Sequence, residues 1–199
     1  MRGARRGVLA GAVATALVLA TGALAAPTPA KLVLRLNDLP TGFKVEPAET
    51  GVRTNATVAK AAKTTVATLK KMGRLTGYEA TFSRVPTEAP DELAGVSRVQ
   101  SFVAAYKTAA GAKAGFARNR KTCAKATKLP LTMRIGDQAA FCRARQSFQG
   151  VEYVVYALVW RSGARTGSLV VVGTSLPLVP PSVPVRLAQT QDARMRTAR

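Results

Sequence analysis

Histidine is absent from this chain, and its absence excludes several classes of chemistry. The 199 residues contain no histidine, two cysteines and ten acidic residues. Without histidine, the chain cannot form a Ser-His-Asp or Cys-His catalytic set, and two thiolates alone do not complete a tetrahedral zinc site. Carboxylates, lysine and tyrosine are the remaining candidates for acid or base catalysis. We therefore expect no metal and no cofactor.

The few acidic residues form no recognisable catalytic pair. Asp91 and Glu92 are adjacent but follow Pro90 in a predicted loop, which favours a solvated turn or helix start over a glycosidase pair. Asp137 follows a glycine and is predicted to be a turn residue whose carboxylate accepts hydrogen bonds from nearby amides. An enzyme would have to use these three carboxylates or Glu79. Glycine-rich nucleotide loops and the G-x-S-x-G motif are absent, so we predict that the protein is not an enzyme.

The N-terminus has the pattern of a bacterial export signal. Three arginines within the first six residues precede an apolar stretch from Val8 to about Leu24. Ala23-Leu24-Ala25 fits an A-x-A cleavage site, so residues 1–25 are predicted to be a signal peptide that is cleaved after Ala25. A retained membrane anchor is the alternative, because an apolar run of this length nearly spans a bilayer. Arg5-Arg6 also leaves the twin-arginine route open beside the general secretory route.

The remaining chain, residues 26–199, is long enough for one domain with a substantial core. Removing the signal peptide takes away three of the thirty basic residues and none of the acidic ones, leaving a formal charge of +17. Such a chain is attracted to anionic surfaces. The predicted partner is an anionic envelope polymer or a membrane surface, without specific binding of nucleic acid, and the protein is predicted to be a monomer. Alternatively, the charge is only that of a soluble surface from an organism rich in Arg, Ala and Val.

Hydrophobic periodicity predicts an α+β fold. Strands are expected at 32–36, 78–82, 96–103, 138–147, 151–161 and 165–174, and helices at 56–73, at about 106–126 and from Ser182 to a basic tail starting near Arg194. Thr54 or Asn55 is predicted to cap the first helix. Runs of strands joined by short turns predict an antiparallel sheet of about five or six strands with two or three helices packed on one face.

The two cysteines are predicted to form a disulfide. Cys123 lies near the end of a predicted helix and Cys142 in the following strand, and oxidation is the default for an exported protein. The chain contains no C-x-x-C redox motif. A bridge requires Cα atoms about 5 to 6 Å apart, and closing this loop contributes about 3 kcal/mol in the chain-entropy description.

Basic side chains provide the candidate anion-binding residues. At the tip of a predicted hairpin, Arg161 and Arg165 flank backbone amides and could hold a phosphate or a carboxylate between them. Arginine at the end of a hairpin is otherwise simply solvated. The outward faces of the predicted helices extend the candidate set to Lys60, Lys63, Lys70, Lys113 and Arg120.

Aromatic residues gather in the last predicted strands. Tyr156 and Trp160 are candidates for the wall of an apolar ligand pocket. The alternative is that they belong to the core together with Phe141, Phe148 and Tyr153.

Short motifs give the chain a resemblance to a loose group of uncharacterised exported proteins of high-GC Gram-positive bacteria. These motifs are Asp38-Leu39-Pro40-Thr41-Gly42-Phe43, Gly77-Tyr78-Glu79-Ala80, Ala112-Lys113-Ala114-Gly115-Phe116, Ile135-Gly136-Asp137-Gln138-Ala139 and the hairpin from Trp160 to Val172. The group looks like small α+β envelope domains similar to the photosystem assembly protein PsbP and its bacterial lipoprotein relatives. This resemblance implies no activity. The chain departs from the lipoproteins because no cysteine lies near the leader junction.

Two functions follow as hypotheses. The first is a non-enzymatic exported domain that associates with the cell envelope, binding an anionic polymer or lipid head groups. The second is a carrier of a small apolar ligand or lipid, with a pocket between the sheet and the helices.

Overall fold

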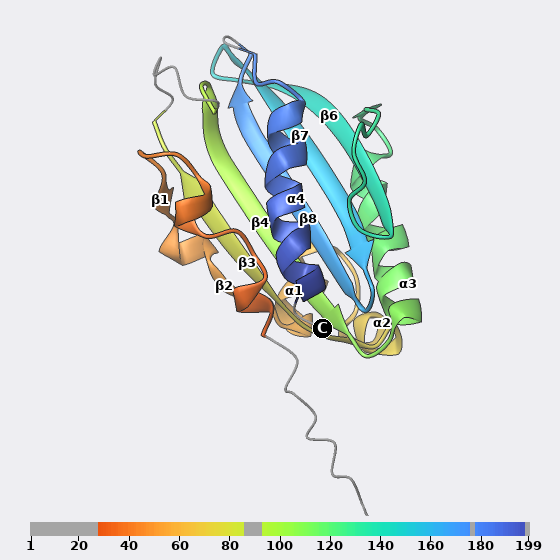
Figure 1. The fold of residues 1–199 in the computed structure, drawn as a ribbon. Helices are drawn as coiled ribbons and strands as arrows, with labels where there is room; N and C mark the ends of the chain where they lie inside the picture. Colours follow the sequence, from red (N-terminus) through yellow and green to blue (C-terminus); the bar gives the residue numbers. More distant parts are fainter. Residues whose placement is uncertain (1–27, 86–92, 176–177, 198–199) are drawn as a thin grey trace, which may run out of the picture.

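The computed structural model describes residues 28–85, 93–175 and 178–197, and an antiparallel sheet forms its centre (Figure 1). The strand order is β1-β3-β4-β8-β7-β6-β5, and β2 also pairs with β3. The strands are β1 (Lys44–Val45), β2 (Gly51–Val52), β3 (Arg74–Ser83), β4 (Val96–Tyr106), β5 (Thr127–Lys128), β6 (Gln138–Phe148), β7 (Val151–Ser162) and β8 (Arg165–Thr174). The leader and the Asp91-Glu92 pair lie outside the described residues.

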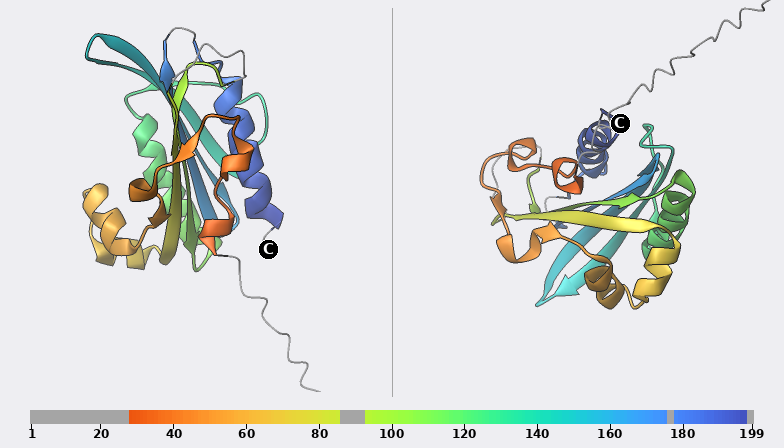
Figure 2. Two further views of the ribbon diagram at one scale, coloured as in Figure 1. Left: turned by 90° about the vertical axis from the view of Figure 1, so that its left-hand side faces the viewer. Right: turned by 90° about the horizontal axis from the view of Figure 1, so that it is seen from below.

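Helices cover both faces of the sheet. The described α-helices are α1 (Asn55–Ala61), α2 (Val66–Lys71), α3 (Ala109–Asn119) and α4 (Ser182–Thr197), and the described 3-10 helices are η1 (Pro29–Lys31), η2 (Leu36–Asp38), η3 (Pro47–Glu49) and η4 (Arg120–Cys123). Figure 2 shows α4 on one face of the sheet and α1, α2 and α3 on the other. None of the described helices has the length and apolar character needed to cross a membrane.

The predicted sheet of five or six strands with helices on one face is therefore wrong, although the fold is still α+β. The sheet has eight strands, and β1, β2 and β5 are only two residues long. Strands this short cannot show the alternation of apolar and polar residues by which a strand is recognised.

Two further sequence predictions fail at particular residues. The expected strand at 32–36 is instead a buried connection between η1 and η2, in which Leu32, Val33 and Leu34 are all buried. The expected helix 56–73 is split into α1 and α2, because Lys63 adopts a φ of 46° and the Thr65 side chain caps a new helix by accepting a hydrogen bond from the Thr68 amide. Of the two residues predicted to cap the first helix, Thr54 is the cap, and its side chain accepts a hydrogen bond from the Thr57 amide.

A chain of buried hydrogen bonds fixes α4 and the N-terminal segment on the sheet. Ser101 of β4 accepts a hydrogen bond from the Leu34 amide (2.9 Å) and donates one to Gln191 Oε1 of α4 (2.8 Å). Gln191 also donates to the Phe102 carbonyl (2.9 Å). Gln191 and Ser101 are fully buried, so each partner satisfies a polar atom that would otherwise be costly to bury.

An ion pair adds a second connection between α4 and the N-terminal segment. Arg194 donates to both carboxylate oxygens of Asp38, each at 2.5 Å, and the Arg35 amide donates to the same carboxylate at 2.6 Å. Burial alone raises the pKa of Asp38, but the hydrogen bonds from Arg194 and Arg35, together with their positive charges, hold that pKa below its usual value of 3.8.

This depressed pKa predicts a loss of stability in acid. A carboxylate whose pKa is lowered by folding contributes stability that is fully present above its unfolded value, here 3.8, and that disappears as the pH falls through the lower folded value. We expect urea unfolding measured between about pH 5 and about pH 2 to show a steeper loss of stability for the natural protein than for Asp38→Asn. Parallel curves for the two proteins would show that Asp38 does not contribute in this way.

Candidate anion-binding surface and groove

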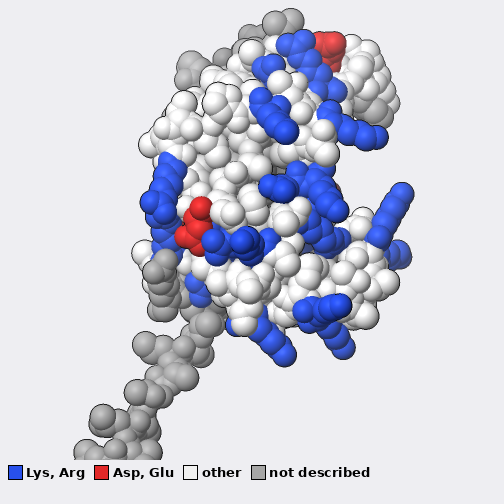
Figure 3. Space-filling view, turned by 90° about the vertical axis from the view of Figure 1, so that its right-hand side faces the viewer, with Lys and Arg blue, Asp and Glu red and all other residues white. Residues whose placement is uncertain are grey.

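The helical elements on one face of the sheet carry no acidic residue. The chain has no Asp or Glu between Glu49 and Glu79, or between Glu92 and Asp137, and these intervals contain all of α1, α2, α3 and η4. Figure 3, which views the α3 side of the molecule, shows many basic and few acidic side chains there. We call the following residues the basic layer: Lys60, Lys63, Lys70, Lys71, Lys107, Lys113, Arg118, Arg120, Lys121 and Lys125.

The packing of α3 explains why its basic residues face the solvent. Ala112, Gly115 and Phe116 are the buried residues of this helix. Gly115 lies so close to Tyr106 that an added Cβ would be 2.2 Å from the phenolic oxygen, so only glycine fits against this strand. Lys113 is exposed, and Arg118 reaches across to donate a hydrogen bond to the Ala62 carbonyl after α1 (3.4 Å).

Five predicted anion-binding residues lie in this layer and are exposed. Lys60 is on α1, Lys63 follows it, Lys70 is on α2, Lys113 is on α3 and Arg120 begins η4. A hollow of about 690 Å³ between the end of α2 and the start of α3 is lined by Lys70 and by two lysines that sequence reasoning did not single out, Lys71 and Lys107.

A buried arginine, Arg74, forms hydrogen bonds with the start of α1. The Arg74 guanidinium donates to Asn55 Oδ1 (2.7 Å) and to the Arg53 carbonyl (2.8 Å). Burial lowers the pKa of Arg74 from its usual value, partly offset by Tyr106, while Arg118 lowers it further. The role of Arg74 in the described structure is to hold the start of α1, where the basic layer begins.

The two arginines of the β7–β8 hairpin form an ion pair and hydrogen bonds with groups of the chain itself. Arg161 forms an ion pair with Asp137 (3.0 Å) and donates to the Gly163 carbonyl (3.2 Å), and Arg165 donates to the Met195 carbonyl of α4 (2.8 Å). Asp137 also accepts a hydrogen bond (2.9 Å) from the amide of Gly163, a residue of the β7–β8 turn rather than of its own turn. The structure thus places a carboxylate of the chain where an anion was expected.

Glu79, the remaining candidate carboxylate among the described residues, is paired with a cation. Glu79 forms an ion pair with Arg53 (2.7 Å). Within residues 28–85, 93–175 and 178–197, no group of three or more Cys, Asp or Glu side chains is arranged to hold a metal ion.

The predicted pocket aromatics are part of the core. Trp160 and Tyr156 are fully buried, Tyr156 donates a hydrogen bond from its hydroxyl to the Val179 carbonyl (2.7 Å), and its ring stacks on Phe141 at 5.8 Å between ring centres. Tyr153 is half-buried, and the side chain of Phe148 is not among those described. Because Tyr156 and Trp160 are enclosed by neighbouring side chains, they fill space rather than line an open groove.

The predicted disulfide is confirmed. Cys123 of η4 and Cys142 of β6 are bonded at an S–S distance of 2.04 Å, with their Cα atoms 5.6 Å apart. The bond ties the end of the α3–η4 helical segment to the sheet, and it agrees with folding in an oxidising compartment outside the cytoplasm.

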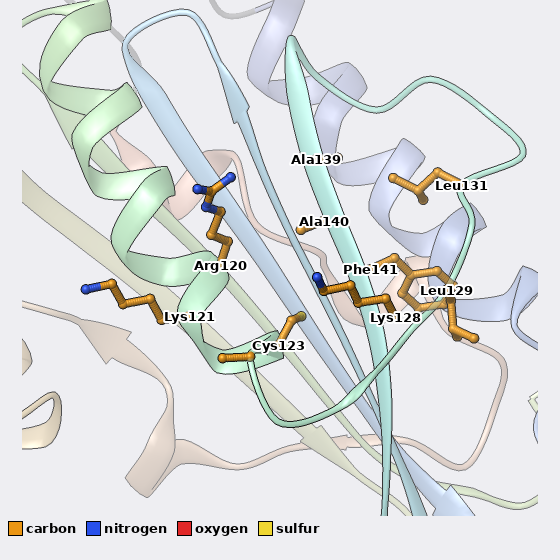
Figure 4. Close-up of a pocket in the computed structure, with 10 residues that line it drawn as sticks. Arg120, Lys121, Cys123, Lys128, Leu129, Leu131, Ala139, Ala140 and Phe141 are labelled. Atoms are coloured by element: carbon orange, nitrogen blue, oxygen red, sulfur yellow. The ribbon is translucent and has the colours of Figure 1, made fainter.

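A groove of about 610 Å³ lies beside the disulfide (Figure 4). One wall is η4 and the next residue, the other is the segment from Lys128 to Leu131, and the floor is Ala139, Ala140 and Phe141 of β6. In Figure 4, Lys128 extends over β6 from one side, Arg120 lies beside the helical segment on the other side, and Lys121 points away. The ten lining residues include three cations and no carboxylate.

Sequence reasoning missed most of this groove. Of its lining residues, only Arg120 was a candidate anion-binding residue, and Cys123 was considered only as half of a disulfide. The available signal was the run Lys128-Leu129-Pro130-Leu131-Thr132-Met133-Arg134, in which apolar residues are flanked by cations. The pattern is short, and only the fold brings it next to η4 and β6.

Comparison with known proteins leaves the function open. No family model matches the chain, and neither does any curated protein. Among solved structures, the chain is similar to the extracellular domain of PknH from Mycobacterium tuberculosis, with 9% sequence identity and a TM-score of 0.44, over 83% of this chain and 93% of that chain.

Proposed function

We propose that the protein is an exported, non-enzymatic domain that associates with the cell envelope by binding anionic polymer or lipid head groups through its basic layer. The observation that carries the proposal is the absence of acidic residues from α1, α2, α3 and η4. Surfaces that serve only solubility are best served by interspersed charges of both signs. A layer with charges of one sign instead concentrates polyanions and anionic head groups near itself.

The arrangement also suits a surface-binding role rather than recognition of one residue. The lysines of the layer are exposed and are distributed over α1, α2, α3, η4 and the segments beside them, so they can approach different charges of an extended partner. Exposed charges interact through solvent, and their contribution is screened as the ionic strength rises. The proposal therefore predicts binding that depends on salt and on the number of layer lysines.

The test compares two double variants with the same net charge. Each lysine near an anionic bilayer contributes about 1 kcal/mol, so Lys70→Gln/Lys71→Gln should weaken binding to vesicles containing phosphatidylglycerol about 30-fold. The control is Lys31→Gln/Lys44→Gln, which removes two exposed lysines outside the layer and should have a clearly smaller effect. Binding is measured by vesicle co-sedimentation and by retention of inorganic polyphosphate, each at low and high salt.

Two results would count against the proposal. If both double variants lose affinity equally, only net charge matters and the layer has no special role. If binding by the natural protein does not weaken as salt is raised, the interaction is not electrostatic.

A further inference from the structure

We infer that the groove between η4 and β6 binds a single anionic amphiphile, a molecule with a phosphate head group and one hydrocarbon chain. The inference deepens the proposed function and rests on it, because it identifies one part of the basic surface as a site for an individual lipid-like molecule. The argument uses the two chemically different halves of the groove and its preformed walls.

The first half of the groove is cationic. Arg120, Lys121 and Lys128 are exposed and line the groove without any carboxylate among the other lining residues. Arg120 comes from the η4 wall and Lys128 from the opposite wall, and in Figure 4 the Lys128 side chain extends across β6 toward the η4 side. A guanidinium and an ammonium group that line one groove can each form charge-assisted hydrogen bonds with the oxygens of a phosphate.

The second half is apolar. Leu129, Leu131 and Ala139 are half-buried and pack against the main core, and buried Phe141 lies beside them. Their remaining exposed surface is removed from water when a hydrocarbon chain lies against it, which is favourable in proportion to the area covered. Inorganic phosphate would leave the apolar half of the groove exposed to water. A neutral lipid would bring no negative charge to the three cations that line the groove. The volume of about 610 Å³ is within the range of small-molecule sites.

Both walls of the groove are held in place before any ligand arrives. The Cys123–Cys142 bond fixes η4 to β6. On the other side, the segment from Lys128 is anchored at its start by the hydrogen bond from the Leu129 amide to the Phe141 carbonyl (2.9 Å). At its end, the Gly136 amide donates to buried Asp192 of α4 (2.9 Å). A preformed site loses less conformational entropy on binding.

The experiment titrates the disulfide-bonded protein with dodecyl phosphate below its micelle concentration, by isothermal titration calorimetry. We expect one molecule to bind per chain, much more tightly than inorganic phosphate or the uncharged dodecyl maltoside. Lys128→Gln and Leu131→Ser should each weaken binding about tenfold, because one removes a charge-assisted contact and the other an apolar contact.

Two matched controls separate the groove from its surroundings. Lys113→Gln removes a cation of the basic layer that does not line the groove, and Met133→Ser removes an exposed apolar residue of the same segment that does not line it. Neither should change the affinity for dodecyl phosphate by more than about twofold. Circular dichroism spectra and unfolding curves check that all four variants are folded.

The outcomes distinguish the groove from the basic layer. If dodecyl phosphate does not bind, if inorganic phosphate binds as tightly, or if Leu131→Ser has no more effect than Met133→Ser, the inference is overturned. The proposed function still stands if polyphosphate binding depends on Lys70 and Lys71. If instead the groove variants behave as expected while polyphosphate binding does not change on replacement of Lys70 and Lys71, the groove is a lipid site and the proposed function fails.

Discussion

Replacing Cys123 and Cys142 with alanine will lower the free energy of unfolding by about 3 kcal/mol. The bridge joins residues 19 positions apart, and without it the unfolded chain gains the conformational freedom of that loop. Both cysteines are buried, so the alanine side chains also leave a small volume unfilled. Urea unfolding of the natural protein and of the double variant measures the difference.

Reduction provides the control for this variant. A thiol reductant should destabilise the natural protein by a similar amount and leave the double alanine variant unchanged, because only the former has a bond to break. Mass spectrometry of alkylated, natively folded protein should find no free thiol. If both cysteines are alkylated without unfolding, the folded protein does not contain the bridge and the prediction is wrong.

The same variant separates the two binding surfaces. Lys60, Lys63, Lys70 and Lys71 lie on or beside α1 and α2, away from the bridge in the chain, so polyphosphate binding should be retained while the protein is folded. Cys123 lines the groove, and loss of the bridge frees the η4 wall. We therefore expect dodecyl phosphate binding to weaken, since a site that must be ordered on binding has lower affinity.

The long strands could be predicted from the sequence because their patterns are local. The expected strand 165–174 has the bounds of β8, and the expected strands 138–147 and 151–161 each end one residue short of β6 and β7. Turn residues separate these runs, and the run 151–161 is apolar on both of its alternating faces, with Tyr156 and Trp160 on the buried face of β7. Length, flanking turn residues and β-branched content identify such runs as strands.

The faces covered by the helices could not be predicted in the same way. A helix with one apolar stripe can pack on either face of a sheet, and the stripe alone does not determine which face the helix covers. In this structure, the choice is made by contacts between distant residues, such as Gln191 with Ser101 and Arg194 with Asp38. The groove depends on similar long-range placement, because η4, the Lys128 segment and β6 meet only after the sheet has formed.

The break between α1 and α2 is a different kind of failure. The apolar residues of 56–73 fit one helix, yet the sequence Thr64-Thr65 supplies a cap for a second one. Threonine side chains compete with helical hydrogen bonds by bonding to nearby amides. The local cap prevails over the longer periodicity, and it leaves Lys63 in the connection between α1 and α2 while Lys70 is on α2.

Trp160→Ala is expected to destabilise the protein by about 3 to 5 kcal/mol, the largest effect of any substitution discussed. Trp160 is fully buried in the main core. Its indole lies over Gly167 on the neighbouring strand, where an added Cβ would be 2.4 Å from two ring carbons. The ring cannot move aside because it is enclosed, so Gly167→Ala alone should also destabilise, by about 1 to 3 kcal/mol.

The two substitutions should not be additive. Once Trp160 is alanine, the contact that makes Gly167→Ala unfavourable is gone, and alanine in a strand costs less conformational entropy than glycine. In the Trp160→Ala protein, Gly167→Ala should therefore be neutral or stabilising, and a double-mutant cycle from urea unfolding should give a coupling energy of at least about 1 kcal/mol. Additive effects would mean that Gly167 is required by its backbone rather than by the indole. A large coupling energy would instead show that Trp160 of β7 and Gly167 of β8 depend on each other, because the absence of a side chain at residue 167 leaves the space that the indole occupies.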